Sequence, residues 1–377
     1  MKVGIVQQLS TKPLKRISPS RFVAMQQCAL REVFAAAGNR PLLPVNPSAR
    51  VGSIIHKLLQ DVGSGAVVQD KESLNAAWST LVSETEGQMK DSSTERFLVP
   101  LRANVSDLEV RRIRAIHRAL SLKVFGSRVA GKETKAQKLP VGCEVWVQST
   151  NGRVGGFIDV AFESSTGIVI CDYKSGSIID AGTGHNGTPK DEYVVQLKLY
   201  SALYFETFGF WPIGAELLPL VGEALKVVIE PENCVQILAN ANQLFNSVNA
   251  RVAGCSAGHV DGLNELASPG SERCVHCLFR PGCPAYKRAS RENGMESLPD
   301  VIGEVAFVNL QGNKRYQIGV STVRGDVVVR QLSHGDGRHG AIEALQVGDT
   351  VGIFDVQFDS TRKSATETNR TTIYCLS

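Results

Sequence analysis

Two aspartates and a lysine lie in two neighbouring β-type segments, and they are the first candidates for chemistry. Asp159 lies within the run from residue 156 to 162, and Asp172 and Lys174 end the run from 167 to 174. Side chains alternate along a strand, so Asp172 and Lys174 share one face, and pairing of the strands can bring Asp159 beside them. Two carboxylates can hold Mg²⁺ or Mn²⁺. Such an ion can activate a water molecule against a phosphodiester while a lysine stabilises the developing charge.

The alternative to a catalytic role is a solvated hairpin with an ordinary salt bridge, because the pattern Asp-x-Lys is common in proteins. The neighbouring residues favour a functional role. Asp172 follows the apolar run Ile168–Ile170, and Ser175-Gly176 follows Lys174. Charged groups at the end of a buried strand need partners that offset the cost of burial.

The segments around this trio predict an α/β domain. Turn residues separate three β-type runs, which predicts a hairpin meander. Ser18-Pro19-Ser20 can cap an N-terminal helix that Gly38-Asn39 ends. We also expect helices near 52–59, 104–124 and 191–208, and strands near 143–147, 156–162, 167–174 and 213–220.

The character of the sequence changes after residue 298, where short β-type runs replace the mixed pattern. Five are expected, near 303–309, 316–322, 327–332, 350–358 and 371–376. Several short strands in a small module are typical of a barrel or a sandwich. We therefore expect one domain over residues 1–298 and a small all-β module, resembling an OB-like barrel, over 299–377. Such barrels often bind single strands, and docking of a protein is an equal alternative.

Composition places the chain among ordinary globular proteins. It has 377 residues, 43% of them hydrophobic, and a formal net charge of +4, which neither indicates nor excludes a nucleic-acid partner. No apolar stretch of about 18 residues or more predicts a membrane span, and the first residues lack a signal-peptide pattern. We expect a cytoplasmic protein with no membrane partner. The sequence lacks a G-x4-G-K-[ST] run, so unwinding of DNA would need a separate helicase subunit.

Three of the nine cysteines form a dense cluster. Two residues separate Cys274 from Cys277, and five separate Cys277 from Cys283. Structural zinc is one interpretation, with His276 or His259 as the fourth ligand. An iron–sulfur cluster is the other, and it needs a fourth thiolate. Five other cysteines show no paired spacing, and we interpret them as structural. They are Cys143, Cys171, Cys234, Cys255 and Cys375.

Three segments taken together resemble a known family. They are residues 156–159 (GFID), 172–176 (DYKSG) and 196–200 (QLKLY). In order and spacing they resemble the RecB-like branch of the PD-(D/E)XK nucleases, which includes the AddB-type iron–sulfur exonucleases and the CRISPR-associated RecB-like exonucleases. The resemblance implies a restriction-endonuclease-like core, in which helices flank a central mixed sheet, with an iron–sulfur cap. It covers residues 17 to 290.

The resemblance also implies roles for individual residues. Asp159, Asp172 and the main-chain carbonyl of Tyr173 would bind Mg²⁺ or Mn²⁺, and Lys174 would position the attacking water. His56, in the pattern Gly-x-x-x-His that begins at Gly52, would be a further metal ligand. Gln196 and Tyr200, one helical turn apart, would support the active site or contact DNA. Glu144, on the preceding strand, is a weaker candidate for a metal-binding or supporting role.

The same resemblance assigns the cysteine cluster. It implies that Cys28 joins Cys274, Cys277 and Cys283 in one [4Fe–4S] cluster, which would fasten the N-terminal helix to the end of the nuclease domain. The family often has Cys-Pro at the first of these positions, whereas this chain has Cys28-Ala29. That difference affects the start of a helix and leaves the thiol in place. Without the resemblance, Cys28 would be read as a packed helix residue.

Basic residues supply candidates for contact with DNA. Arg111, Arg112, Arg114 and Arg118 lie in the expected helix 104–124, and Lys132, Lys135 and Lys138 follow it. They could follow a phosphate backbone, or they could form a solvated helical face. We expect a metal-dependent DNA nuclease, an exonuclease that acts on single-stranded or frayed DNA in repair, recombination or defence. The alternatives are a catalytically inactive iron–sulfur scaffold subunit and a restriction-type endonuclease.

Overall fold

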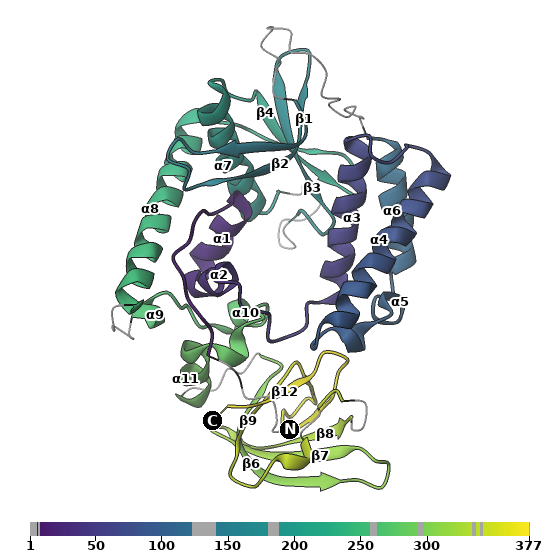
Figure 1. The fold of residues 1–377 in the computed structure, drawn as a ribbon, viewed down its shortest axis with the longest axis vertical. Helices are drawn as coiled ribbons and strands as arrows, with labels where there is room; N and C mark the ends of the chain where they lie inside the picture. Colours follow the sequence, from purple (N-terminus) through teal and green to yellow (C-terminus); the bar gives the residue numbers. More distant parts are fainter. Residues whose placement is uncertain are drawn as a thin grey trace.

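Two β-sheets organise the chain in a computed structural model (Figure 1), which describes residues 6, 8–122, 141–179, 188–256, 262–292, 298–333, 337–339 and 342–376. The first sheet has five strands in the order β1-β2-β3-β4-β5. Their bounds are β1 (Gly142–Gln148), β2 (Gly155–Glu163), β3 (Ile168–Lys174), β4 (Gly214–Pro219) and β5 (Leu225–Val227). The first four agree closely with the predicted strands.

This first sheet is mixed. β1, β2 and β3 pair antiparallel as the predicted meander, whereas β3 and β4 pair in parallel. A parallel pair needs a crossover connection, and helix α7 (Asp191–Phe208) lies between the two strands in the chain. Together with the flanking helices, this mixed sheet fits the expected restriction-endonuclease-like fold.

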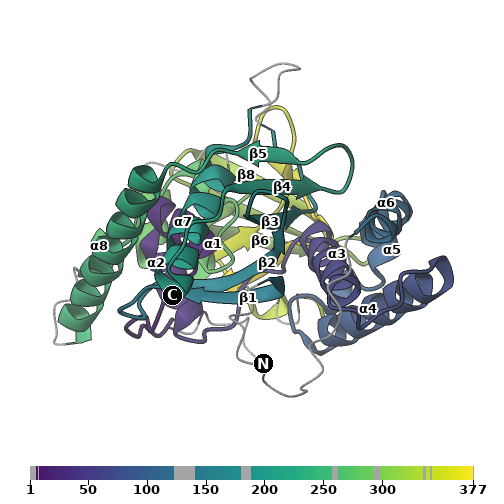
Figure 2. The ribbon, with the colours of Figure 1, turned by 90° about the horizontal axis from the view of Figure 1, so that it is seen from above.

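Helices cover both faces of the five-stranded sheet (Figure 2). One face packs against α1 (Pro19–Gln27), α2 (Ala29–Ala36), α7 and α8 (Pro231–Ser256). The other face packs against α3 (Pro47–Gly63), α4 (Lys71–Asp91) and α6 (Leu108–Leu120). Shorter elements complete this part: η1 (Arg96–Leu98), α5 (Leu101–Asn104), α9 (Gly262–Glu265), α10 (Ser271–Cys274), η2 (Arg280–Gly282) and α11 (Pro284–Glu292). None of the helices that the structure describes is long and apolar enough to cross a membrane.

Two predicted helices differ from the observed ones. The N-terminal helix is broken into α1 and α2 at Cys28, whose backbone is extended at φ −160° and ψ 102°. The helix expected over 104–124 begins only at Leu108, because α5 ends at Asn104 and Val105 is extended. The break at Cys28 occurs where an apolar helical pattern continues, whereas Ser106 and Asp107 are residue types that commonly begin a helix at Leu108.

The second sheet lies in the C-terminal module, which we define as the described residues from Val301 to Leu376. Seven strands follow the order β10-β11-β8-β7-β6-β9-β12. Their bounds are β6 (Val301–Leu310), β7 (Tyr316–Thr322), β8 (Gly325–Leu332), β9 (Thr350–Phe354), β10 (Gln357–Phe358), β11 (Ser364–Thr366) and β12 (Thr372–Cys375). The predicted run 350–358 is divided into β9 and β10 at Asp355, which has a left-handed φ of 58°. β11 was not predicted.

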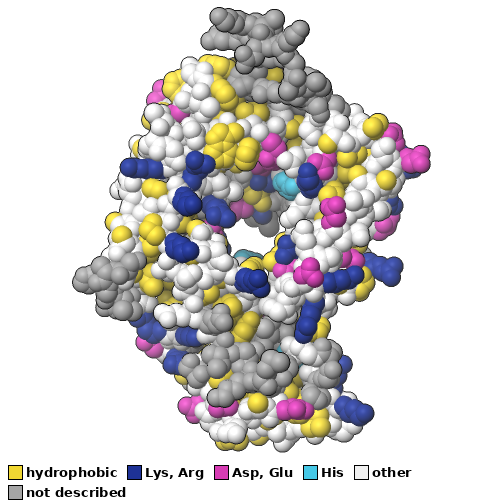
Figure 3. Space-filling model, in the orientation of Figure 1, with side chains coloured by type: hydrophobic (Ala, Val, Ile, Leu, Met, Phe, Trp, Pro, Cys, Tyr) yellow, Lys and Arg dark blue, Asp and Glu magenta, His cyan; other side chains and the backbone are white. Residues whose placement is uncertain are grey.

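A buried arginine joins the C-terminal module to the rest of the chain. Arg280 pairs with Asp300 at 2.7 Å and with Asp355 at 2.6 Å, and only 1% of its side chain is exposed. An apolar cluster surrounds this joint and contains Leu43, Cys274, Tyr286, Leu298, Phe354 and Leu376. The space-filling view shows an opening at the centre of the molecule, above the C-terminal module (Figure 3).

Candidate active site

The register of β1, β2 and β3 aligns three carboxylates across the sheet. Cys143 pairs with Val160 and Val145 pairs with Ile158, which places Glu144 opposite Asp159. Val160 pairs with Cys171, and the same register continued by one residue places Asp159 opposite Asp172. Like charges opposite each other repel. These three side chains therefore concentrate negative charge at one place on the sheet, which we call the carboxylate edge, and a cation bound there would reduce the repulsion.

Asp172 is held by residues from its own strand and from α7. Gln196 donates a hydrogen bond to Asp172 Oδ1 at 2.9 Å, and Lys174 Nζ donates to Gln196 Oε1 at 3.1 Å. Lys174 Nζ also lies 2.5 Å from Asp172 Oδ2. That buried Oδ2 accepts no hydrogen bond of normal geometry within the described part of the chain. A carboxylate oxygen in this position is suited to ligate a cation.

Asp159 lies close enough to Asp172 for their charges to oppose each other. Its Oδ2 accepts a hydrogen bond from the main-chain N–H of Tyr173 at 2.7 Å. Burial raises the pKa of Asp159 to about 7, and the charge of Asp172 adds to this rise against the opposing effect of that hydrogen bond. A divalent cation would favour the ionised form of both carboxylates.

His56 reaches this edge from α3, on the opposite face of the sheet. Its Nδ1 lies 4.0 Å from Asp159 Oδ2, a separation that two donors can have when each lies about 2.1 Å from one ion. Burial lowers the pKa of His56, although Asp172 opposes this effect. The neutral imidazole is the form that binds metals.

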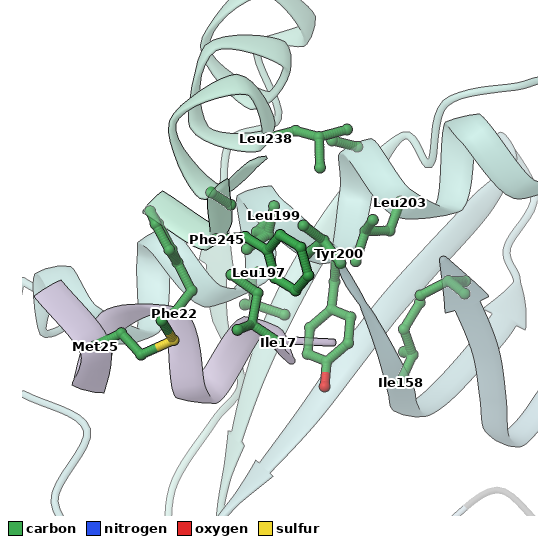
Figure 4. Close-up of a cluster of buried hydrophobic side chains, with 14 of the residues drawn as sticks. Ile17, Phe22, Met25, Ile158, Leu197, Leu199, Tyr200, Leu203, Leu238 and Phe245 are labelled. Atoms are coloured by element: carbon green, nitrogen blue, oxygen red, sulfur yellow. The ribbon is translucent and has the colours of Figure 1, made fainter. Parts of the chain in front are cut away.

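Two tyrosines of α7 lie near the carboxylates and Lys174. Tyr200 lies in the apolar cluster, and its hydroxyl points away from Leu203 and Leu238 (Figure 4). Burial raises the pKa of Tyr200, and Asp172 and Asp159 raise it further, so the hydroxyl keeps its proton. The ring of Tyr193 lies 4.4 Å from Lys174 Nζ. Sequence reasoning missed Tyr193, although it precedes Gln196 by three residues and so shares its helix face.

Glu144, the weaker candidate from the sequence, lies opposite Asp159 in the register of β1 and β2. Its backbone has a left-handed φ of 53°, which is uncommon for a residue other than glycine. Burial raises the pKa of Glu144, and Lys57 opposes the rise. The negative charge of Glu144 also contributes to the raised pKa of Asp159. A left-handed backbone that carries a half-buried carboxylate is a feature often found at functional sites.

The four cysteines expected to bind a cluster line one cavity, together with residues that include Arg31, Phe34 and Tyr286. Cys28 enters it from the break between α1 and α2. Burial raises the pKa of Cys277 to about 11 and that of Cys283 to about 12, with smaller contributions from the other cysteines. His276 is exposed and does not line this cavity, and His259 lies outside the described residues.

The structure does not by itself reveal a metal centre. Within the ranges it describes, no three or more His, Cys, Asp or Glu side chains form a group that could hold a metal ion. The chemistry of the donors still fits the expected ions: carboxylate and carbonyl oxygens with an imidazole suit Mg²⁺ or Mn²⁺, and four thiols suit an iron–sulfur cluster. Both ligand sets therefore stay predictions.

Helix α6, which carries the four candidate arginines, lies on the far side of α3 from the five-stranded sheet (Figure 2). Arg111 pairs with Asp107 at 2.8 Å, and Arg118 donates to the carbonyl of Gly222 at 2.6 Å. Arg112 pairs with Glu109, and Arg114 is exposed. Contact with DNA remains a prediction for all four arginines. Lys132, Lys135 and Lys138 lie outside the described residues.

Comparison with known proteins agrees with the geometry. The sequence model of the PD-(D/E)XK nuclease superfamily matches residues 16–284, which include both strands of the carboxylate edge, His56, α7 and the four cysteines. No curated protein matches the sequence. Because the family match covers well over half of the 377 residues, this chain belongs to the PD-(D/E)XK nuclease superfamily.

Proposed function

We propose that this protein is a metal-dependent DNA nuclease of the RecB-like, iron–sulfur branch, and that it degrades single-stranded or frayed DNA as an exonuclease. Membership in the superfamily implies a nuclease-type function. The observation that carries the proposal is the hydrogen-bonded set of Asp172, Lys174 and Gln196 beside Asp159. An inactive scaffold would have no need to keep these polar groups together at a buried edge.

Each candidate residue would have a distinct role in cleavage. Asp159, Asp172 and the Tyr173 carbonyl would hold Mg²⁺ or Mn²⁺, with His56 as a further ligand. When bound, the ion supplies a Lewis acid and lowers the pKa of a coordinated water. The Lys174 ammonium orients the attacking water and stabilises negative charge on the phosphate. Gln196 fixes both Asp172 and Lys174 by its two hydrogen bonds.

A cleavage assay tests this proposal. End-labelled single-stranded and duplex DNA are incubated with Mg²⁺ or Mn²⁺ and the parent, Asp172→Asn or Lys174→Gln. Each variant should lose at least about a hundredfold in rate, since each lacks charge that acts in the transition state. Lys198→Gln is the control, because Lys198 lies on α7 but pairs with Glu230 at 3.1 Å. Full activity of both catalytic variants would refute the assignment.

Digestion of closed circular DNA separates the exonuclease from a restriction-type endonuclease. An exonuclease leaves circles intact, whereas an endonuclease linearises them. A pure preparation that binds DNA and cuts neither form would favour the scaffold alternative. A separate helicase subunit stays a prediction from the sequence.

We further propose that Cys28, Cys274, Cys277 and Cys283 bind a [4Fe–4S] cluster. Support comes from their shared cavity and from the exposed position of His276, which makes Cys28 the better fourth ligand. Protein purified without oxygen should contain about four irons per chain. Cys28→Ser and Cys277→Ser should lose that iron, whereas the control Cys255→Ser should retain it. One zinc per chain and no iron would overturn this assignment.

We also interpret the C-terminal module as an OB-like barrel. β9 and β10 form one bent stretch: β9 pairs with β6, and β10 pairs with β11. β11 pairs with β8, β8 with β7, and β7 with β6. The pairings therefore lead from β9 around the module to β10, which follows β9 in the chain. Such a circuit is expected of a closed barrel.

A further inference from the structure

The C-terminal module contains a second cavity, remote in sequence from the catalytic residues. Its volume is about 410 Å³, within the range of small-ligand sites, which begins at about 300 Å³. The residues that line it all follow residue 284, where the match to the nuclease family ends. Membership in the superfamily therefore does not tell what this cavity binds.

Strand pairing brings two basic turns to the same side of this cavity. β11 pairs in parallel with β8, with Ser364 opposite Val328, so the turns that precede the two strands lie at the same end of the sheet. Arg324 lies in the turn before β8, and Arg362 and Lys363 lie in the turn before β11. Three cationic side chains from two separate turns thus line one cavity.

Threonine hydroxyls fix the shape of both turns. In the first turn, Thr322 Oγ1 accepts a hydrogen bond from the main-chain N–H of Arg324 at 3.1 Å. In the second, Thr361 Oγ1 donates to Asp359 Oδ1 at 2.9 Å and accepts from the main-chain N–H of Lys363 at 3.3 Å. Side chains that bond to their own turn in this way restrict its conformation. The backbone that carries the cations is therefore well defined.

Arg362 is held in place by contacts on two sides. Its backbone has a left-handed φ of 56°, which is uncommon for a residue other than glycine. Its Nη2 donates to the carbonyl of Leu298 at 2.7 Å, and its guanidinium lies 3.8 Å from the centre of the Phe358 ring. A guanidinium has five N–H donors. The bond to Leu298 therefore fixes the position of Arg362 and uses one of them.

The cavity carries an excess of positive charge. Burial lowers the pKa of Arg362, and the charge of Arg324 lowers it further, against the opposing effect of Asp300. Asp300 is already paired with Arg280 at 2.7 Å. Among the described residues that line the cavity, Asp326 is the other carboxylate. An anion bound between the two turns would reduce the repulsion between the arginines.

Helix α11 adds a hydroxyl to the wall of the cavity. Only 7% of Ser290 is exposed, and its Oγ, beside Tyr286, has no hydrogen-bond partner of normal geometry in the described ranges. A buried hydroxyl without a partner is costly, and a ligand oxygen would supply one. Tyr286 also lines the cysteine cavity, so one residue of α11 borders both cavities.

We propose that this cavity binds a phosphate group, at a site separate from the catalytic carboxylates. The paired N–H donors of arginine match the oxygens of a phosphate, and lysine adds a compact charge. Arg324 and Arg362 would hold the phosphate from the two turns, with Lys363 beside them. A free nucleotide and the backbone of a nucleic-acid strand share this chemistry. The proposal goes beyond the nuclease function and does not depend on it.

Calorimetric titration of the full-length Lys174→Gln protein tests this site, because that background lacks the catalytic ammonium. The probes, used without added metal, are inorganic phosphate, thymidine 5′-monophosphate, thymidine and a dT strand of about 12 nucleotides. We expect both small phosphates to bind and thymidine not to bind. Arg324→Gln and Arg362→Gln should each weaken phosphate binding at least about tenfold, since each removes charge-assisted hydrogen bonds.

Arg330→Gln is the matched control, because Arg330 is an exposed arginine of β8 that does not line the cavity. Arg324→Lys should lose less affinity than Arg324→Gln, because it keeps the charge without the paired donors. Arg324→Gln decides the test if Arg362→Gln does not fold, since Arg324 lies in an exposed turn. The proposal is overturned if the starting protein binds neither small phosphate, or if Arg330→Gln loses as much affinity as Arg324→Gln.

The strand probe identifies the source of the phosphate. Weaker binding of the dT strand by Arg324→Gln would assign the site to a nucleic-acid backbone. Loss of monophosphate binding with unchanged strand binding would assign it to a free nucleotide. Both results support a phosphate site. A parent protein that cleaves DNA while the cavity binds no phosphate would keep the nuclease proposal and refute this one, and the reverse result would do the opposite.

Discussion

Charge repulsion dominates the catalytic centre at the scale of single residues. Glu144, Asp159 and Asp172 face one another across three strands, and Lys174 is the one ammonium shown in contact with them within the described residues. The folded chain therefore carries an electrostatic cost that a divalent ion would relieve. Proteins commonly keep such destabilising groups where function requires them.

Replacing Asp159 by asparagine should stabilise the metal-free protein while abolishing cleavage. The pKa of Asp159 is about 7 in the folded protein and lies near 3.8 otherwise. The folded state therefore holds an extra proton between these values, and this group's contribution to stability is lost as pH rises from about 4 to 7. We expect Asp159→Asn to gain about 1–3 kcal/mol at pH 8 in EDTA. This is less than the full shift at about 1.4 kcal/mol per pKa unit, because an amide accepts the hydrogen bond from Tyr173 less strongly than a carboxylate does.

Thermal unfolding across pH 5 to 8 measures this effect. The advantage of the variant should shrink toward pH 5, and Mg²⁺ should raise the melting temperature of the parent only. Glu163→Gln is the control, because it removes an exposed carboxylate from the end of the same strand. An advantage independent of pH would show that Asp159 titrates normally.

At the scale of elements, the sequence predicted what local patterns determine. The meander from β1 to β3 and the limits of α7 follow from alternation, turns and periodicity. The break at Cys28 does not follow from these patterns, because the residues on both sides of it favour a helix. Tyr193 was missed because its partner Lys174 is a neighbour only in the folded chain. The prominence of Glu144 depends on strand register, which pairs of residues far apart in sequence determine.

The close packing of α3 against the end of β3 leads to a prediction at this scale. A Cβ atom at Gly52 would lie 3.0 Å from Ser175 Oγ, whereas one at Gly87 on α4 would meet nothing within 4 Å. Gly87→Ala should stabilise the protein by about 0.5–1 kcal/mol through helix propensity and leave cleavage unchanged. Gly52→Ala should gain less and cleave several-fold more slowly, because it moves His56 away from Asp159.

Chemical denaturation and the cleavage assay at several Mg²⁺ concentrations test this pair. The loss in Gly52→Ala should diminish as Mg²⁺ rises, since the displaced imidazole weakens metal binding. Equal behaviour of the two variants would show that the spacing between α3 and β3 does not matter for the site.

At the scale of the whole molecule, long-range contacts decide the architecture, and the sequence pattern contains little indication of them. The change of pattern near residue 298 predicted a domain boundary there, and β6 begins close to it, at Val301. The joint between Arg280 and Asp355 connects residues 75 positions apart, and the contact between Leu42 and Tyr374 spans 332. No periodicity encodes such pairs. The central opening emerges only from how these distant segments meet.

The Arg280 joint gives the last prediction. Arg280→Ala would leave Asp300 and Asp355 buried without their main cation, so we expect a loss of about 3–5 kcal/mol in the free energy of unfolding. Arg280→Lys should lose less than Arg280→Ala, because it keeps the positive charge. It should still lose some stability, because lysine cannot form the bidentate pair with Asp300. Arg273→Ala, an exposed arginine of the same segment, should change stability by less than about 0.5 kcal/mol. Urea unfolding monitored by fluorescence measures all three. If Arg280→Ala were no worse than Arg273→Ala, the buried pairs would not be what holds the C-terminal module against the rest of the chain.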